Sequence, residues 1–172
     1  MPIVCTFDRH GEAILAIFND AILTSTALYD YAPRTLTMIQ AWFEAKAKGN
    51  FPVLGYENAH GALMGFASYG AFRAYPANKY TVEHSVYVDA PFRGKGLAAL
   101  LLQRIIDHAG QAQLHVLVGG IDATNHASIR LHEKMGFSHA GTIRHAGFKF
   151  GRWLDLAFYQ RILETPANPV DG

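Results

Sequence analysis

Residues 81–99, with the sequence TVEHSVYVDAPFRGKGLAA, hold a strand, a short glycine-containing loop and the start of a helix in immediate succession. The β-branched and aromatic side chains of residues 80–89 predict the strand, and Pro91 ends it. Apolar residues then recur with helical spacing from Leu97 to Ala109. This order predicts an α/β domain in which the loop of residues 93–96 leads directly into a long helix.

The loop between this strand and this helix has the features of an anion site. Gly94 and Gly96 would let a ligand approach the main chain closely. The N–H groups of the first helical turn have no partner within the helix, and the helix dipole adds about half a positive charge there. A phosphate or pyrophosphate would therefore be held well at this place.

Three interpretations of the loop stay open on these residues alone. The dinucleotide fingerprint G-x-G-x-x-[GA] formally fits Gly94, Gly96 and Ala99, but no acidic residue stands about 20 positions further on. The phosphate-binding pattern G-x-x-x-x-G-K-[ST] is absent. The pattern R-x-x-G-x-A, with Arg93 and Ala98 around Gly96, is typical of the pyrophosphate cradle of acyl-CoA-dependent N-acyltransferases. Beside the dinucleotide fingerprint and the R-x-x-G-x-A pattern, the third interpretation is an ordinary glycine-bearing loop before a helix.

The rest of the chain predicts further strands and helices of a single α/β domain with a mixed sheet. We expect this domain to span residues 1–164, followed by a flexible carboxy-terminal tail of residues 165–172, which has two prolines and no periodicity. Strands are expected at residues 2–7, 51–56, 62–72, 114–118, 137–143 and 154–163, and helices at residues 14–22, 35–49 and 125–135.

Composition excludes several classes of function. The chain of 172 residues has a formal charge of +1, so we expect neither a nucleic acid nor a membrane as partner. The single cysteine, Cys5, excludes an internal disulfide framework and a zinc site with several thiolates. The nine histidines show no metal-ligand spacing, so we expect no metal. Without a signal peptide or a membrane-length apolar run, the protein is expected to be cytoplasmic.

A second pattern decides between the interpretations of the loop. Residues 125–137 read N-x-x-S-x-x-x-H-x-x-x-G-F, which resembles a CoA-side signature of the GNAT family of N-acetyltransferases, where the pattern is N-x-x-[AS]-x-x-x-Y-x-x-x-G-F. Residues 81–88, 129–133 and 146–155 look like the branch of that family that acetylates phosphinothricin and methionine sulfoximine. The similarity runs from about residue 3 to residue 163, which is nearly the whole chain.

The resemblance implies a fold, a reaction and partners. The fold would be the GNAT fold, a mixed and mostly antiparallel sheet that splays between its fourth and fifth strands and carries helices on both faces. The reaction would be transfer of acetyl from acetyl-CoA to the α-amino group of a small amino acid or analogue, by direct attack and without a metal. The enzyme is expected to be a homodimer.

The resemblance also assigns residues to the cosubstrate. Backbone groups of Val86 and Val88 would pair with pantetheine as an added strand does, and the Val88 N–H would polarise the thioester carbonyl. The amides of residues 94–99 would hold the pyrophosphate. The full set of expected acetyl-CoA contacts is Val86, Tyr87, Val88, Arg93, Gly94, Lys95, Gly96, Leu97, Ala98, Ala99, Asn125 and Ser128.

Two side chains are expected to move protons. A carboxylate such as Glu83 is costly to place in an apolar strand, and it could take the proton of an attacking amine. His132 stands where the family usually has a tyrosine that protonates the departing thiolate, and the resembled branch has histidine there. The alternatives are that Glu83 faces solvent or pairs with Arg73, and that His132 only fills a contact between helix and sheet.

The amino-acid substrate is expected to meet Tyr29, Arg73, Tyr75, Glu83 and His84. Arg73 would bind the substrate carboxylate, since a guanidinium matches a carboxylate with two parallel hydrogen bonds. Two other functions remain as alternatives. The chain could be a non-catalytic acyl-CoA-binding module, which would need neither Glu83 nor Arg73, or a GNAT enzyme for another amine, such as a protein N-terminus or an aminoglycoside.

Overall fold

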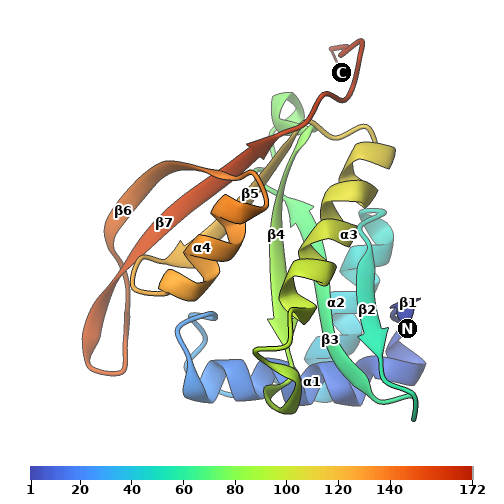
Figure 1. Ribbon diagram of the computed structural model, residues 1–172, viewed down its shortest axis with the longest axis vertical. Helices are drawn as coiled ribbons and strands as arrows, with labels where there is room; N and C mark the ends of the chain where they lie inside the picture. The colour runs from blue at the N-terminus through green and yellow to red at the C-terminus, as the bar shows by residue number, and fades with distance from the viewer. Residues whose placement is uncertain (172) are drawn as a thin grey trace. The chain divides into compact units, whose positions relative to one another are not determined.

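The computed structural model describes residues 1–171, and within them the chain forms seven strands and four α-helices (Figure 1). The strands follow the order β1-β2-β3-β4-β5-β7-β6, with β4 and β5 parallel. The mixed α/β class expected from the sequence is confirmed.

The elements are β1 (Pro2–Val4), α1 (Phe7–Thr24), α2 (Leu36–Lys48), β2 (Val53–Glu57), β3 (Leu63–Ala71), β4 (Thr81–Val88), α3 (Leu97–Gln111), β5 (Val116–Asp122), α4 (His126–Lys134), β6 (Ser138–Lys149) and β7 (Arg152–Ile162), with short 3-10 helices at Pro76–Asn78 and Ala90–Phe92.

Capping residues place the helix starts. The sequence offers Thr35 or Thr37 as the N-cap of helix α2. The helix begins after Thr35, whose side-chain oxygen accepts the Met38 N–H at 3.3 Å. Helix α1 begins earlier than expected, because the Thr6 N–H finds its acceptor in Nδ1 of His10 at 2.9 Å. The first strand is correspondingly shorter than residues 2–7.

Strands β5 and β6 differ from the expected residues. The apolar run of residues 114–118 predicts only the start of β5, which continues through Gly119 and Gly120 to Asp122. Strand β6 extends to Lys149 as the partner of β7, although its register shifts twice and most of its side chains are exposed. Polar and glycine residues in these stretches hide the alternation by which strands are found.

The chain divides into two compact units. Unit 1 contains residues Met1–Gly70 and Ser85–Ile105, and unit 2 contains Ala71–His84 and the chain from Ile106 onward. Strand β4 therefore gives its first half to unit 2 and its second half to unit 1. The part of the chain that the structure describes has no helix long and apolar enough to span a membrane.

Aromatic rings form the centre of unit 1. The ring of Phe18 on α1 lies edge-on to Phe66 of β3 and to Tyr87 of β4, with centroids 5.1 and 5.0 Å apart. Trp42 of α2 completes the cluster at 5.5 Å from Phe18. Edge-to-face contacts of this kind stabilise beyond the burial of their area.

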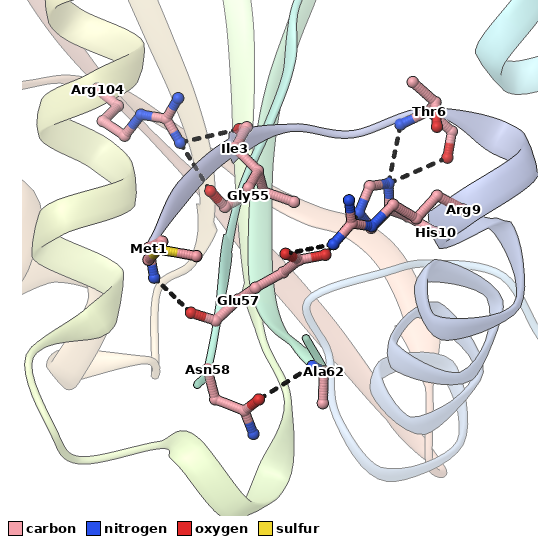
Figure 2. Close-up of polar contacts among 10 residues, drawn as sticks. All are labelled: Met1, Ile3, Thr6, Arg9, His10, Gly55, Glu57, Asn58, Ala62 and Arg104. Atoms are coloured by element: carbon pink, nitrogen blue, oxygen red, sulfur yellow. Dashed lines mark hydrogen bonds and ion pairs between the residues drawn. The ribbon is translucent and has the colours of Figure 1, made fainter. Parts of the chain in front are cut away.

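A buried carboxylate joins α1 to β2 in the same unit (Figure 2). Glu57 is 2% exposed, and its two oxygens accept from Arg9 at 2.8 Å and from Nε2 of His10 at 3.1 Å. Because Nδ1 of His10 already accepts the Thr6 N–H, Nε2 is the nitrogen that donates. Arg104 of α3 donates to the carbonyls of residues 3 and 55 and so holds β1 beside β2. No buried side-chain nitrogen or oxygen of this network lacks a hydrogen-bond partner, which makes its burial tolerable.

Unit 2 contains the first half of β4, β5, α4 and the long hairpin of β6 and β7 (Figure 1). Residues that follow β7 return to the start of β4, where the Tyr80 hydroxyl donates to the Val170 carbonyl at 3.3 Å and accepts the Val170 N–H at 3.2 Å. Thr165 donates to the Leu114 carbonyl. The flexibility expected of residues 165–172 stays a prediction.

Gly65 of β3 marks a close approach to the second half of β4. A Cβ atom at this position would lie 2.7 Å from the Tyr87 carbonyl oxygen and 3.1 Å from the Val88 Cα. Because both are main-chain atoms, neither can move away without a shift of β4. We expect Gly65→Ala to lower the free energy of unfolding by about 1–3 kcal/mol, as overpacking does. Urea denaturation measures the change.

Gly110→Ala is the matched control for this substitution. Gly110 lies near the end of α3 with no atom within 4 Å of its Cβ position, so alanine there should be neutral or stabilising by up to about 1 kcal/mol. Equal effects of the two substitutions would contradict the close approach of β3 to β4.

Candidate active site

The first half of β4 presents two different faces in unit 2. Its residues Thr81–His84 pair in parallel with Val116–Gly119 of β5, so Glu83 stands opposite Val118 and His84 opposite Gly119. Successive side chains of a strand point to opposite faces. Glu83 is on the solvent-accessible face, while His84 is buried at 5% exposure. The two neighbouring side chains therefore belong to two separate chemical environments.

Glu83 is a partly desolvated carboxylate with a guanidinium nearby. Burial raises the pKa of Glu83, and the positive charge of Arg73 acts in the opposite direction. Within the described chain, Arg73 is exposed, donates one hydrogen bond to the Phe72 carbonyl at 3.1 Å and lies over the Phe72 ring. Most of its donors are left for a ligand. The role of Glu83 as a base and the role of Arg73 in binding the substrate carboxylate therefore both remain predictions that this geometry allows.

His84 and His132 form a buried pair on the other face. Their Nε2 atoms lie 3.0 Å apart, and their rings stack at a centroid distance of 5.2 Å. The ring of Phe137 lies within 5.2 Å of both. Burial lowers the pKa of both histidines, and the neighbouring His132 lowers that of His84 further. His132 thus occupies a contact between helix and sheet, and it contacts a second titratable group there.

The spacing N-x-x-S-x-x-x-H is explained by the start of α4. Asn125 is the N-cap, and its side-chain oxygen accepts the Ser128 N–H at 3.1 Å. One turn later, the Ser128 carbonyl accepts from Nδ1 of His132 at 2.8 Å. The three residues that the pattern singles out are therefore connected, and they orient the imidazole toward β4.

Two glycines of β5 lie beside the candidate site residues and were not expected there from the sequence. A Cβ at Gly119 would lie 3.0 Å from Cε1 of His84 and 3.2 Å from Nε2 of His132. A Cβ at Gly120 would lie 3.2 Å from a carboxylate oxygen of Glu83. The signal was a pair of glycines inside a strand, which marks close approach of other groups. They make room for the histidines on one face and the carboxylate on the other.

The glycine loop of unit 1 has the geometry expected of an anion cradle. Gly94 and Gly96 have φ angles of +73° and +80°, which favour glycine, and no atom lies within 4 Å of either Cβ position. The loop is exposed, and Leu97 behind it is buried and begins α3. The Ala99 N–H, which belongs to the expected cradle, donates to the Gly96 carbonyl at 3.1 Å. A main chain that is open in front and leads into a helix start could hold a pyrophosphate through the N–H groups that precede Ala99.

The two basic side chains of this loop mainly shape it. Arg93 donates through Nε to the Val88 carbonyl at 2.9 Å and pairs with Asp20 of α1 at 2.5 Å. Lys95 donates to the Pro91 carbonyl at 3.0 Å. These contacts fix the loop to the end of β4 and to α1. The direct contact of either side chain with a cosubstrate stays a prediction.

The other expected residues divide between the units. Val86, Tyr87 and Val88 lie on the second half of β4 in unit 1, and Tyr29 is an exposed residue between α1 and α2. Tyr75 belongs to unit 2, is 72% exposed and precedes the short helix Pro76–Asn78. Within residues 1–171, no three His, Cys, Asp or Glu side chains are grouped so that they could hold a metal ion.

The known proteins to which this chain is similar are described as acetyltransferases. Residues 14–137 match the Acetyltransferase (GNAT) family. An L-methionine sulfoximine/L-methionine sulfone acetyltransferase of Pseudomonas paraeruginosa is 47% identical over 151 residues, which are 88% of this chain and 88% of that protein. A solved structure from Acinetobacter baylyi ADP1 has a TM-score of 0.99 and 56% identity, covering 100% of this chain and 97% of the other. A phosphinothricin acetyltransferase of the GNAT superfamily from Sinorhizobium meliloti, in complex with acetyl-CoA, has a TM-score of 0.93 and 29% identity, covering 98% and 91%.

The buried histidine pair should make folding sensitive to acid. Burial lowers the pKa of His84 to about 3, whereas a histidine in the unfolded chain takes a proton near pH 6.5. Below that pH the unfolded state binds more protons, so the free energy of unfolding falls as pH decreases, by up to about 1.4 kcal/mol per pH unit for each such histidine. We expect His84→Phe to show a shallower decline between pH 6.5 and 4.5, measured by urea denaturation.

His126→Gln is the control, because His126 is an exposed histidine on the same helix as His132. It should keep the pH dependence of the natural chain. A decline that is the same in all three proteins would show that the resting buried pair is already protonated in the folded state between pH 6.5 and 4.5.

Proposed function

The chain belongs to the GNAT family of acetyltransferases, and we propose that it transfers the acetyl group of acetyl-CoA to the α-amino group of a small amino acid or amino-acid analogue. Methionine sulfone, methionine sulfoximine and phosphinothricin are the proposed substrates, by analogy with the relatives described above. The observation that carries the proposal is the placement of Arg73 and Glu83 in one unit, with an exposed guanidinium acting on a partly desolvated carboxylate.

The two charges of this pair suit the two ends of an amino acid. Arg73 would bind the substrate carboxylate through two N–H groups, which suits an α-amino acid and does not suit a simple amine. Glu83 would take a proton from the α-ammonium group, directly or through a water molecule, since only the neutral amine attacks a thioester. An α-amino group titrates near pH 7.7–8.0, so a base is useful at neutral pH.

Unit 1 would supply the site for acetyl-CoA. The main-chain N–H groups of residues 94–98 would bind the pyrophosphate, since the Ala99 N–H donates to the Gly96 carbonyl. The Val88 N–H would polarise the thioester carbonyl. As the new C–N bond forms, the C–S bond breaks, and the departing thiolate takes a proton for which His132 is the proposed source. The α-ammonium group loses one proton to Glu83 before the attack and a second one as the amide forms. The thiolate takes one proton, so one proton in total is released to solvent and the reaction balances without an acyl-enzyme.

The direct test is turnover of acetyl-CoA, followed as thiol release, with a panel of amines. We expect turnover with L-methionine sulfone, L-methionine sulfoximine and phosphinothricin, and none with the α-amide of methionine sulfone at the same concentration. A preference for a peptide with a free amino terminus would replace the proposal with a protein-directed activity. Tight binding of acetyl-CoA without turnover of any amine would indicate a binding module.

Gly96 tests the anion cradle through a pair of isosteric substitutions. Asparagine and aspartate tolerate the left-handed conformation to similar degrees, but only aspartate places a negative charge beside the proposed pyrophosphate. We expect Gly96→Asp to weaken CoA binding at least about tenfold more than Gly96→Asn, measured by calorimetry. Similar affinities of the two variants would place the pyrophosphate elsewhere.

Arg73 tests the recognition of the substrate carboxylate. We expect Arg73→Ala to cost about 1.5–3 kcal/mol in kcat/KM for the amino acid. Because the Arg73 charge lowers the pKa of Glu83, its loss should also move the acidic limb of the pH–rate profile to higher pH.

Arg73→Lys separates these two effects. It keeps the positive charge and loses the bidentate geometry, so it should restore the acidic limb while leaving kcat/KM low. A normal kcat/KM in Arg73→Ala would give Arg73 a purely structural role.

A further inference from the structure

We propose that His84 is a positioning residue for His132. It donates the hydrogen bond that fixes His132 in one tautomer, and its own Nδ1 is the atom at which the buried pair takes up a proton. The inference concerns the proton that reaches the departing thiolate, and in that respect it rests on the proposed function.

The tautomer of His132 follows from its helix. Nδ1 of His132 lies 2.8 Å from the Ser128 carbonyl oxygen, and a carbonyl oxygen only accepts hydrogen bonds. Nδ1 therefore carries a proton. Because burial disfavours the charged ring, the other nitrogen, Nε2, has a lone pair and no proton.

The tautomer of His84 follows from that of His132. The two Nε2 atoms are 3.0 Å apart, and a contact of that length between two nitrogens needs one proton between them. Since His132 has no proton at Nε2, the proton belongs to Nε2 of His84. The neutral ring of His84 then has a bare Nδ1.

This Nδ1 is the one buried side-chain nitrogen or oxygen in residues 1–171 that lacks a hydrogen-bond partner. It is also the only ring nitrogen of the pair that can accept a further proton. When it does so, the proton between the Nε2 atoms can move to His132, and His132 then has an N–H at Nε2 to give.

The consequence is that resting His132 is not yet an acid. Its Nδ1–H is held by a carbonyl, and its Nε2 is an acceptor. The proton that the thiolate takes would leave Nε2 of His132 after one proton from solvent has entered at Nδ1 of His84. One proton enters at Nδ1 of His84, one leaves from Nε2 of His132, and the product is a neutral thiol. His84 is then protonated on Nδ1, and the pair returns to its resting tautomers when that proton is exchanged for one on Nε2.

Of the groups described around the pair, His84 is the one that can donate a hydrogen bond to Nε2 of His132. From β5 the pair meets the glycine Gly119, and from the end of α4 it meets the apolar Phe137. Glu83 of β4 points to the opposite face. Burial and the neighbouring His132 lower the pKa of His84, and the main chain of Val118 on β5 acts in the opposite direction.

The first test is nuclear magnetic resonance of the full chain labelled with ¹⁵N-histidine, without substrates, at pH 7.5. Long-range ¹H–¹⁵N correlations distinguish protonated from bare ring nitrogens. We expect the proton of His132 on Nδ1 and that of His84 on Nε2. A proton on Nε2 of His132, or on Nδ1 of His84, would overturn the inference whether or not the protein acetylates amines.

The second test compares three variants of the full chain. His84→Leu removes the donor to His132, His84→Gln can supply an amide N–H in its place, and His126→Gln is the exposed control. We expect at least about a tenfold loss of kcat in His84→Leu with a changed pH–rate profile and an unchanged KM for acetyl-CoA. In His84→Gln the amide N–H should keep the proton of His132 on Nδ1, but kcat should stay low because the amide cannot take up a proton.

The outcomes separate this inference from the proposed function. Unchanged kcat and pH profile in a folded, active His84→Leu would contradict the positioning role while leaving the acetyltransferase proposal intact. A merely structural role would lower stability and change KM without altering the pH profile. Absence of activity in the natural chain would overturn the proposed function, and the spectroscopic result would still decide the tautomers.

Discussion

Neighbouring side chains of a strand must point to opposite faces, and in β4 this constraint separates two kinds of proton chemistry. Glu83 reaches the accessible face, where Arg73 acts on its charge, and His84 is sealed against α4. A one-residue slip of β4 against β5 would exchange the two environments. Gly119 and Gly120 of β5 fit this register, since each leaves room for one of the two side chains. The register of two parallel strands therefore determines which of these two ionisable side chains is accessible.

In the proposed anion site, the main chain would supply the attraction that a positively charged surface supplies in other proteins. With a formal charge of +1, the chain has no general attraction for anions. Its candidate anion site is a turn with two left-handed glycines ahead of a helix start, and the two basic side chains of that turn are engaged in holding its shape. Backbone N–H groups keep their orientation without the entropy cost of long side chains, which suits repeated binding and release of a cosubstrate.

Local patterns predicted most of the fold and part of the site. Helical periodicity, the Thr35 cap and the hairpin of β2 and β3 depend on nearby residues, so the sequence predicts them well. The contact between His84 and His132 depends on strand register and helix packing across 48 residues, which no local pattern contains. Likewise, Gly119 and Gly120 have no strand propensity, and only the side chains opposite them explain their place in β5. The assembly of all site residues around one substrate stays a prediction.

The measurement that tests the central claim most directly is kcat of Glu83→Gln as a function of pH, beside Glu133→Gln as an exposed control on α4. Glutamine keeps the shape of the side chain and removes its basicity. If Glu83 is the base, kcat falls about 10²–10⁴-fold near pH 7, CoA affinity stays nearly unchanged, and part of the loss returns at high pH, where the free amine is already neutral. A kcat for Glu83→Gln at pH 7 equal to that of the natural chain would contradict the account.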